Sequence, residues 1–296
     1  MRHEFSIRPF LLIILHIFIA TSLISISKYT FTKIDINPFL FLFYRNAASF
    51  VILLPLIIPV FTASFKIHRY HISFLRSGSG ILAITIWTYA YSNLALSTAT
   101  MLTFITPVIT LLLASRILKE RLSKTRIVVI CISFIGVFIA IKPQFEGEWF
   151  YYLLVFISCL FWSIGNISRK MASNINNVKN WICYFSIWSV VLTFFFALPF
   201  IKLPDLNLLP FILVAGILTA FANIMSFNAY KASDVGVIQS FDFLRLIFAS
   251  LVDVFVFHHT LTFSLYIGSF LIISSCVFII YSENRKIKKL NKSFLS

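Results

Sequence analysis

Residues 38–60 read PFLFLFYRNAASFVILLPLIIPV, an apolar run interrupted by a single charged side chain, Arg45. A helix of about 20 apolar residues spans the roughly 30 Å hydrocarbon core of a bilayer. Because lipid offers no hydrogen-bond partners, the main chain of such a run must satisfy its own polar groups as a helix. The apolar residues are continuous rather than alternating, which argues against the strands of a membrane barrel. The run therefore predicts a transmembrane helix.

The rest of the chain repeats this pattern. Its 296 residues are 59% hydrophobic and 12% charged, whereas soluble domains carry about 25% charged residues. The sequence therefore predicts an all-α, polytopic membrane protein with about ten transmembrane helices. The expected spans are 9–27, 38–60, 77–96, 98–118, 126–142, 149–168, 181–201, 208–229, 234–257 and 262–282.

The distribution of basic residues predicts the topology. With the N-terminus inside, most Lys and Arg residues fall in the cytoplasmic connections, Arg76 and Arg169 among them. The outer connections receive Lys28, Lys33, Lys142 and Lys202. Positive charge collects on the cytoplasmic side of membrane proteins, so both termini are expected in the cytoplasm, and the membrane is expected to be the bacterial inner membrane. The net charge of +15 is then explained by contact with anionic lipid rather than with nucleic acid.

Short matches between the two parts of the chain indicate an internal repeat. Ala90-Tyr91 recurs as Ala229-Tyr230, and residues 137–139 (VFI) recur at 277–279. The loop 142–148 leaves five spans on each side, an odd number, so the second copy enters the membrane from the opposite side. We expect two inverted five-helix repeats, at 1–143 and at 144–296 with a basic cytoplasmic tail. Such repeats are the usual architecture of secondary transporters, with the site between them.

The ninth span concentrates charge on one face of an expected continuous helix, in Asp242, Arg245 and Asp253. An ionisable residue inside a membrane is costly and marks a functional site by default. Asp242 and Arg245 are three residues apart and can pair directly. Two interpretations remain open, a structural ion pair that orients the helix and a substrate-binding group.

Five further residues are candidates for substrate binding. Arg45 either faces a central cavity, where it would bind an anionic group, or extends to the membrane surface. Trp87 and Tyr91 lie four apart on the third span and could stack on a planar ligand, although packing against lipid or core is the alternative. Asn166 and Asn223 offer hydrogen bonds to a solute or to a neighbouring helix.

Proline and glycine mark two positions in the spans. Pro107 cannot donate a main-chain hydrogen bond, which predicts a broken helix in the fourth span, where transporters place hinges or sites. At the corresponding place in the second half stands Leu246, so we expect the halves to differ there. Gly216 and Ala220 form a small-xxx-small pair that lets two helices approach closely.

Catalytic and metal-binding motifs are lacking. The four cysteines form no CxxC pair and no zinc pattern, and Ser77-Gly78-Ser79-Gly80 lacks the lysine and spacing of a phosphate-binding loop. We therefore expect no enzymatic activity, no catalytic or metal-binding residues and no cofactor.

One stretch carries a family resemblance. Residues 85–91 (TIWTYAY) lead into 97–100 (STAT) and 104–107 (FITP), followed by 118–121 (LKER) and 134–137 (FIGV). These motifs resemble the drug/metabolite transporter superfamily, EamA type, over nearly the whole chain. Within it the chain is most similar to the branch of obligate intracellular bacteria that imports S-adenosylmethionine. That branch has an Arg followed three residues later by a Glu where this chain has Asp242 and Arg245.

The resemblance implies a secondary transporter that moves a small polar metabolite by alternating access, with S-adenosylmethionine uptake as the leading hypothesis. An amino-acid or drug exporter of the same superfamily is the first alternative, and a multi-pass membrane enzyme acting on lipids is the second. The expected partners are the metabolite and the lipid bilayer, without nucleic acid, and the sequence leaves a homodimer open.

Overall fold

The computed structural model describes residues 8–62, 70–92, 102–120, 123–141, 149–175, 177–257 and 263–293. These residues form helices and connections, with no strand among them, which confirms the predicted all-α polytopic class. The α-helices are α1 (Arg8–Lys33), α2 (Pro38–Thr62), α3 (Tyr70–Ser92), α5 (Thr106–Ile117), α6 (Lys124–Ile141), α7 (Trp149–Ile175), α8 (Val178–Ala197), α9 (Leu209–Ala232), α10 (Val235–Phe241), α11 (Leu244–Phe257) and α12 (Phe263–Ser293). Two 3-10 turns, η1 (Leu198–Phe200) and η2 (Leu206–Leu208), join α8 to α9.

The composition of the helices places them in a membrane. Within the described residues, five segments are long and apolar enough to cross a bilayer: Pro9–Phe31, Pro38–Val60, Trp149–Asn174, Val178–Phe200 and Leu206–Ala232. Large apolar side chains also point outward, as Val51, Leu213 and Phe270 do. In water such a surface would drive aggregation, whereas in a bilayer it faces lipid.

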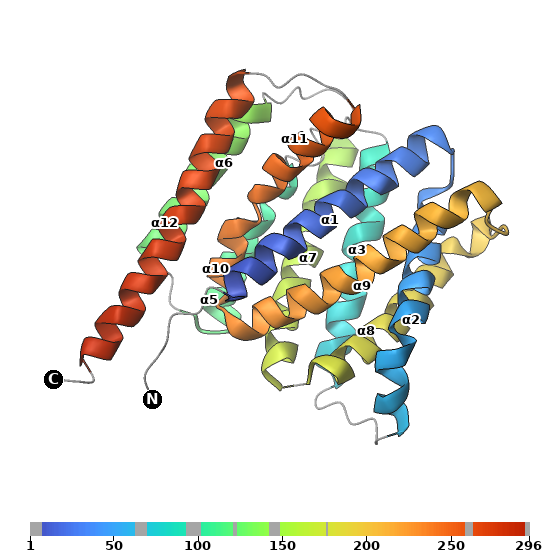
Figure 1. The fold of residues 1–296 in the computed structure, drawn as a ribbon, viewed down its shortest axis with the longest axis horizontal. Helices are drawn as coiled ribbons and strands as arrows, with labels where there is room; N and C mark the ends of the chain where they lie inside the picture. Colours follow the sequence, from blue (N-terminus) through green and yellow to red (C-terminus); the bar gives the residue numbers. More distant parts are fainter. Residues whose placement is uncertain are drawn as a thin grey trace.

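We call the residues before and after the connection 142–148 the two halves of the chain. Helices of one half pack against helices of the other (Figure 1). Helix α1 packs along α9, and α3 packs along α7, so that the first helix of each half contacts the third helix of the other. Helices α6 and α12 lie side by side at one edge, and α2 contacts α8. The predicted boundary at residue 143 lies outside the described residues and stays a prediction.

A small residue allows one of the closest helix contacts. A Cβ atom on Gly216 of α9 would lie 2.7 Å from the Cβ atom of Ala48 in α2, which is closer than two carbon atoms can approach without movement. The predicted small-residue contact at Gly216 is therefore confirmed. It holds α9 against α2, so that α9 can present its polar side chains to the interior.

The predicted continuous ninth helix is wrong, because the segment breaks into α10 and α11 at Asp242 and Phe243. The corresponding segment of the first half breaks at Phe104 and Ile105, ahead of α5. A break thus forms in the second half without a proline, so the two halves share the break although their residues differ there. The two breaks meet in the core, where the rings of Phe104 and Phe243 stack with centroids 5.5 Å apart.

Candidate substrate-binding site

A cavity of about 250 Å³ lies between the two halves. Its lining comes from α1, α2, α3, α5, α7, α8, α9, α10 and α11, together with both breaks. Because all these helices belong to one membrane-spanning bundle, polar side chains at the cavity avoid lipid while remaining accessible to a solute. The cavity is therefore the candidate site for a transported molecule.

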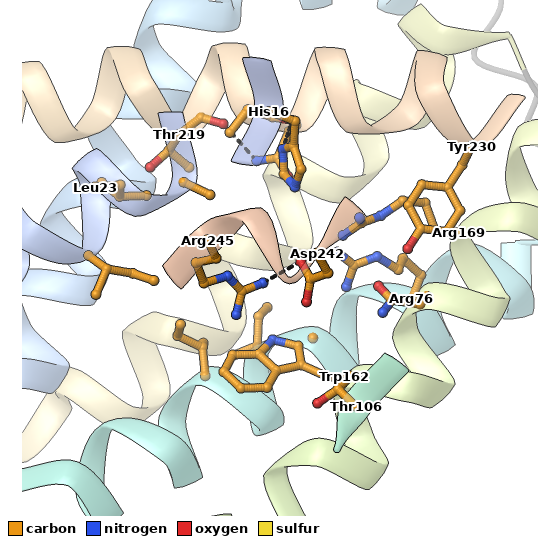
Figure 2. Close-up of a pocket in the computed structure, with 18 of the residues that line it drawn as sticks. His16, Leu23, Arg76, Thr106, Trp162, Arg169, Thr219, Tyr230, Asp242 and Arg245 are labelled. Carbon is orange, nitrogen blue, oxygen red and sulfur yellow. Dashed lines mark hydrogen bonds and ion pairs between the residues drawn. The ribbon is translucent and has the colours of Figure 1, made fainter. Parts of the chain in front are cut away.

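The break between α10 and α11 supplies an ion pair to the cavity. Nη2 of Arg245 donates a hydrogen bond to Oδ1 of Asp242 at 2.7 Å, and the two side chains are 22% and 20% exposed. The predicted direct pairing is confirmed, although the two residues sit at a break rather than on the face of one helix. Figure 2 shows Asp242 near the centre of the site, with Arg245 on one side and Arg169 and Arg76 on the other.

The cavity gathers most of the predicted site residues. The lining includes Arg45, Trp87, Asn166, Asn223, Asp242 and Arg245. Asn223 also donates a hydrogen bond to the carbonyl oxygen of Thr219 at 3.0 Å, one turn earlier in α9. Tyr91 lies in α3 and Asp253 in α11, but their side chains lie outside the described residues, and their roles stay predictions.

Arg76 and Arg169 line the cavity, although the charge pattern placed them in cytoplasmic connections. Their exposed fractions are only 6% and 8%. The error arose at helix ends, because α3 begins at Tyr70 rather than at residue 77 and α7 continues to Ile175 rather than ending at 168. One signal was available in the sequence. Gly80 follows Arg76 by four residues, which leaves room for a long side chain along the same helix face.

Aromatic and amide groups complete the lining, and sequence reasoning did not assign them to the site. Trp162 packs beside Trp87, with ring centroids 5.8 Å apart and planes at 52°. Nε2 of Gln239 donates to the hydroxyl oxygen of Tyr230 at 2.9 Å. Tyr230 could have been found, because it is the repeat counterpart of Tyr91, which the sequence analysis did select.

A histidine of the first helix also reaches the site. Nδ1 of His16 lies 2.9 Å from the carbonyl oxygen of Ala222 in α9, so His16 links α1 to α9 beside the cavity (Figure 2). Within the described residues, no group of three or more His, Cys, Asp or Glu side chains could hold a metal ion. The lining combines the Asp242 carboxylate with arginines, amides, hydroxyls and aromatic rings, which are groups that can bind a polar solute.

A second charged cluster lies outside the cavity, where the α5–α6 connection meets the start of α10. Nη2 of Arg126 donates to Oδ2 of Asp234 at 2.7 Å, and its Nη1 lies 3.9 Å from Oε2 of Glu120. Oε1 of Glu120 accepts the main-chain N–H of Val235 at 3.2 Å. Burial and the nearby Asp234 raise the pKa of Glu120, against the opposing effects of Val235, Arg126 and Lys170. The cluster joins the two halves at this end of the bundle.

A sequence profile described as the EamA-like transporter family matches residues 7–142 and again 149–281. This chain belongs to the EamA-like transporter family. The family match covers nearly the whole chain and confirms the predicted superfamily. It makes the protein a multi-pass membrane transporter, and the cavity between its halves lies where such proteins bind solutes.

Several curated proteins resemble this EamA-family chain over most of their length. The S-adenosylmethionine uptake transporter of Rickettsia bellii is 27% identical over 266 residues, which cover 89% of this chain and 90% of that protein. The protein of the same name from Rickettsia prowazekii is also 27% identical, covering 90% of each chain. The riboflavin transporter of Brucella anthropi is 21% identical, covering 86% of this chain and 91% of that protein.

A solved structure supports the fold. The chain described as "Crystal structure of protein" superimposes with a TM-score of 0.78 at 14% identity, covering 94% of this chain and 97% of that one. At this identity the likeness concerns the arrangement of the helices alone. The same arrangement of helices is therefore found in a solved structure.

Proposed function

We propose that this protein is a secondary transporter that carries a small polar metabolite across the bacterial inner membrane by alternating access. The observation that carries the proposal is a cavity between the two halves that holds the Asp242–Arg245 ion pair at a helix break. Charged groups at such a break, with irregular main chain around them, are the arrangement by which transporters hold a solute near the bilayer midplane. Rocking of the two halves would expose the cavity to each side in turn.

S-adenosylmethionine is the first candidate substrate, because relatives covering most of the chain carry that name. The cavity offers matching groups, which are arginines for the amino-acid carboxylate, Asp242 for a cationic group and an indole wall for the adenine. Riboflavin is the second candidate, supported by the names of other relatives and by the Trp87–Trp162 pair, which could stack on a flavin ring.

The proposed function is tested by uptake into cells that express the protein. Labelled S-adenosylmethionine is supplied outside the cells, and unlabelled competitors are added from a panel that includes riboflavin, amino acids and drugs. Uptake above that of cells without the protein, with competition by the true substrate, supports an importer. Loss of label from preloaded cells would instead indicate the exporter of the alternative hypothesis.

The enzyme alternative and the residue roles need separate readouts. Label recovered chemically unchanged inside vesicles of purified protein would exclude a lipid-modifying enzyme. Asp242→Asn and Arg45→Ala are expected to lower uptake, and Arg116→Gln, an exposed position of α5, serves as the control that keeps it. Unchanged uptake in both cavity variants would remove these residues from the site.

The orientation is part of the same proposal. Both termini are proposed to lie in the cytoplasm, which follows from the basic residues in the connections and the tail. Reporter domains fused to each end, one active only inside the cell and the other only outside, would test it. Activity of the outside reporter at either end would contradict the proposed topology.

A further inference from the structure

The charge of the cavity lining is unbalanced among the described residues. Four arginines face the cavity, from α2, α3, α7 and α11, against one carboxylate, Asp242. Arg245 already pairs with that carboxylate, and Arg76 and Arg169 add two further positive charges to the lining. Positive charges removed from water are costly unless anionic groups or hydrogen bonds compensate them. The lining therefore provides an environment in which an anion is favoured and a cation is repelled.

Arg76 and Arg169 are the arginines best placed to hold such an anion. Both are more than nine-tenths buried. In the part of the chain that the structure describes, no carboxylate lies within 4.0 Å of either guanidinium group. Nη1 of Arg169 donates to the hydroxyl oxygen of Ser226, whereas its buried Nε has no hydrogen-bond partner among the described residues, which leaves that N–H for a ligand. The two side chains come from different halves, so an anion between them would contact both halves.

Neighbouring aromatic rings hold the guanidinium groups of Arg76 and Arg169 in place. The carbon of the Arg76 guanidinium lies 5.2 Å from the ring centre of Phe185, and that of Arg169 lies 5.0 Å from the ring centre of Tyr230. These cation–π contacts fix the position of each group without neutralising its charge. A Cβ atom on Gly80 would collide with Nη1 of Arg76, and one on Gly165 would lie 3.1 Å from the same atom. The two glycines thus make a slot for Arg76 between α3 and α7.

The indole ring of Trp162 lines another side of the cavity from Arg76 and Arg169. Trp162 and Thr106 lie across the cavity from Tyr230 and His16 in Figure 2, with the arginines and Asp242 between. A flat ring could pack on Trp162 while an acidic group on the same molecule reaches Arg76 and Arg169. The volume of about 250 Å³ suits a small soluble metabolite.

On the basis of the proposed transport function, but not of S-adenosylmethionine as its substrate, since that molecule carries a net positive charge, we propose that the cavity selects small solutes of net negative charge. A carboxylate or phosphate group is held between Arg76 and Arg169, and a planar ring packs against Trp162. Guanidinium groups recognise both kinds of anion through paired hydrogen bonds. Among solutes with the same ring, the more negative one is therefore bound and carried in preference.

Two matched pairs of compounds test the charge preference. Riboflavin is compared with riboflavin 5′-phosphate, and S-adenosylmethionine with its neutral thioether, S-adenosylhomocysteine. Binding is measured from the shift of the apparent melting temperature of the purified protein, and transport from uptake into phosphatidylcholine vesicles. In each pair we expect at least tenfold tighter binding of the more negative member, a difference of about 1.4 kcal/mol. Equal or tighter binding of the more positive member, or no shift by these compounds or by inorganic phosphate, would overturn the proposal.

Variants separate ligand binding from a structural role. Arg76→Gln and Arg169→Gln are expected to abolish the preference while the melting temperature without ligand stays unchanged or rises, because a buried charge with no carboxylate within 4.0 Å among the described residues is removed. Gly80→Ala, which displaces the Arg76 guanidinium but keeps its charge, should act like Arg76→Gln. Arg116→Gln is the exposed control and should keep the preference. A preference that survives in both arginine variants would overturn the proposal.

The two proposals fail in distinguishable ways. Charge-dependent binding without transport of any of the four compounds would support the selection of anions and count against the transporter function with these substrates. Transport without preference for the negative members would support the transporter function and overturn the selection of anions.

Discussion

The two helix breaks that meet in the core, one in each half, form at corresponding places from different sequences. In the first half, Pro107 lies in the first turn of α5, and the main chain turns at Phe104 and Ile105. In the second half, Leu246 stands at the position of Pro107, yet the chain still breaks at Asp242 and Phe243. At both breaks a main-chain N–H donates to the carbonyl oxygen three residues earlier instead of four, as Val108 does to Ile105 and Leu246 to Phe243.

The chemistry at the two breaks differs more than the geometry. At the spacing that separates Ala90 from Ala229, Asp242 corresponds to Thr103 and Arg245 to Thr106, and all four side chains line the cavity. The first half thus contributes two hydroxyls where the second half contributes an ion pair. The main-chain geometry is shared, whereas the charge that would bind a solute is concentrated in one half.

The largest effect is expected where the two breaks touch. Phe104→Ala or Phe243→Ala should each cost about 3–5 kcal/mol of stability, because each removes a fully buried ring and leaves a void. The double variant should cost less than the sum by about 0.5–1.5 kcal/mol, the worth of a stacked pair. Apparent melting temperatures in detergent would report all three changes.

A lipid-facing ring provides the control for this comparison. Phe270 of α12 is 70% exposed, so Phe270→Ala should change the melting temperature little. Strictly additive losses at Phe104 and Phe243 would show that the two breaks are stabilised separately, contrary to the contact between them.

The second effect concerns the charge difference between the breaks. Asp242→Asn should lower uptake at least tenfold, because it leaves the guanidinium of Arg245 without its carboxylate partner, a loss of about 1–3 kcal/mol for a hydrogen bond to a charged group. Thr103→Val, at the corresponding place of the first half, should have a smaller effect. Initial rates of labelled uptake, corrected for the amount of protein in the membrane, measure both.

The double variant Asp242→Asn with Arg245→Gln then separates the two interpretations of the pair. Recovery of both melting temperature and uptake in the double variant would identify a purely structural ion pair. We expect the double variant to recover the melting temperature but not uptake, because the ion pair is proposed to bind the solute.

The third effect tests how much Pro107 contributes to its break. Because the second half breaks without a proline, Pro107→Ala should cost less than about 1 kcal/mol. By contrast, a proline introduced at Leu251, in the middle of α11, should cost about 3 kcal/mol or more. The pair of melting temperatures reports the difference. A large loss in Pro107→Ala would mean that the first break depends on its proline after all.

The smallest effect concerns the link between the end of α5 and the start of α10. The pKa of Glu120 is raised by burial and by Asp234. The stabilising effect of its protonation is therefore fully present below the ordinary carboxyl pKa and is lost as pH rises through the raised pKa. We expect the melting temperature to fall over that range, and Glu120→Gln to reduce the fall. The same fall with pH in wild type and variant would assign it to another group.

Hydropathy located the spans because burial in lipid leaves each helix no alternative, and residues 38–60 became α2 almost at the predicted ends. The same hydropathy averages placed Arg76 and Arg169 outside the predicted spans. An average over a segment sets a helix end at the first charged residues, so it does not distinguish a buried arginine near a helix end from a cytoplasmic one. The Asp242–Arg245 pair was predictable from its spacing. Its position at a break was not, because nothing local in residues 234–257 interrupts a helix.

The sequence by itself determined that the chain is a bundle of membrane helices and which family it belongs to. Both follow from local composition and short motifs, which do not depend on distant contacts. Only the tertiary structure decided that the second break exists, that four arginines share one cavity with one aspartate, and that Arg76 fits a slot lined by Gly80 and Gly165. These features arise between helices far apart in the chain, where packing and the cost of buried charge act together.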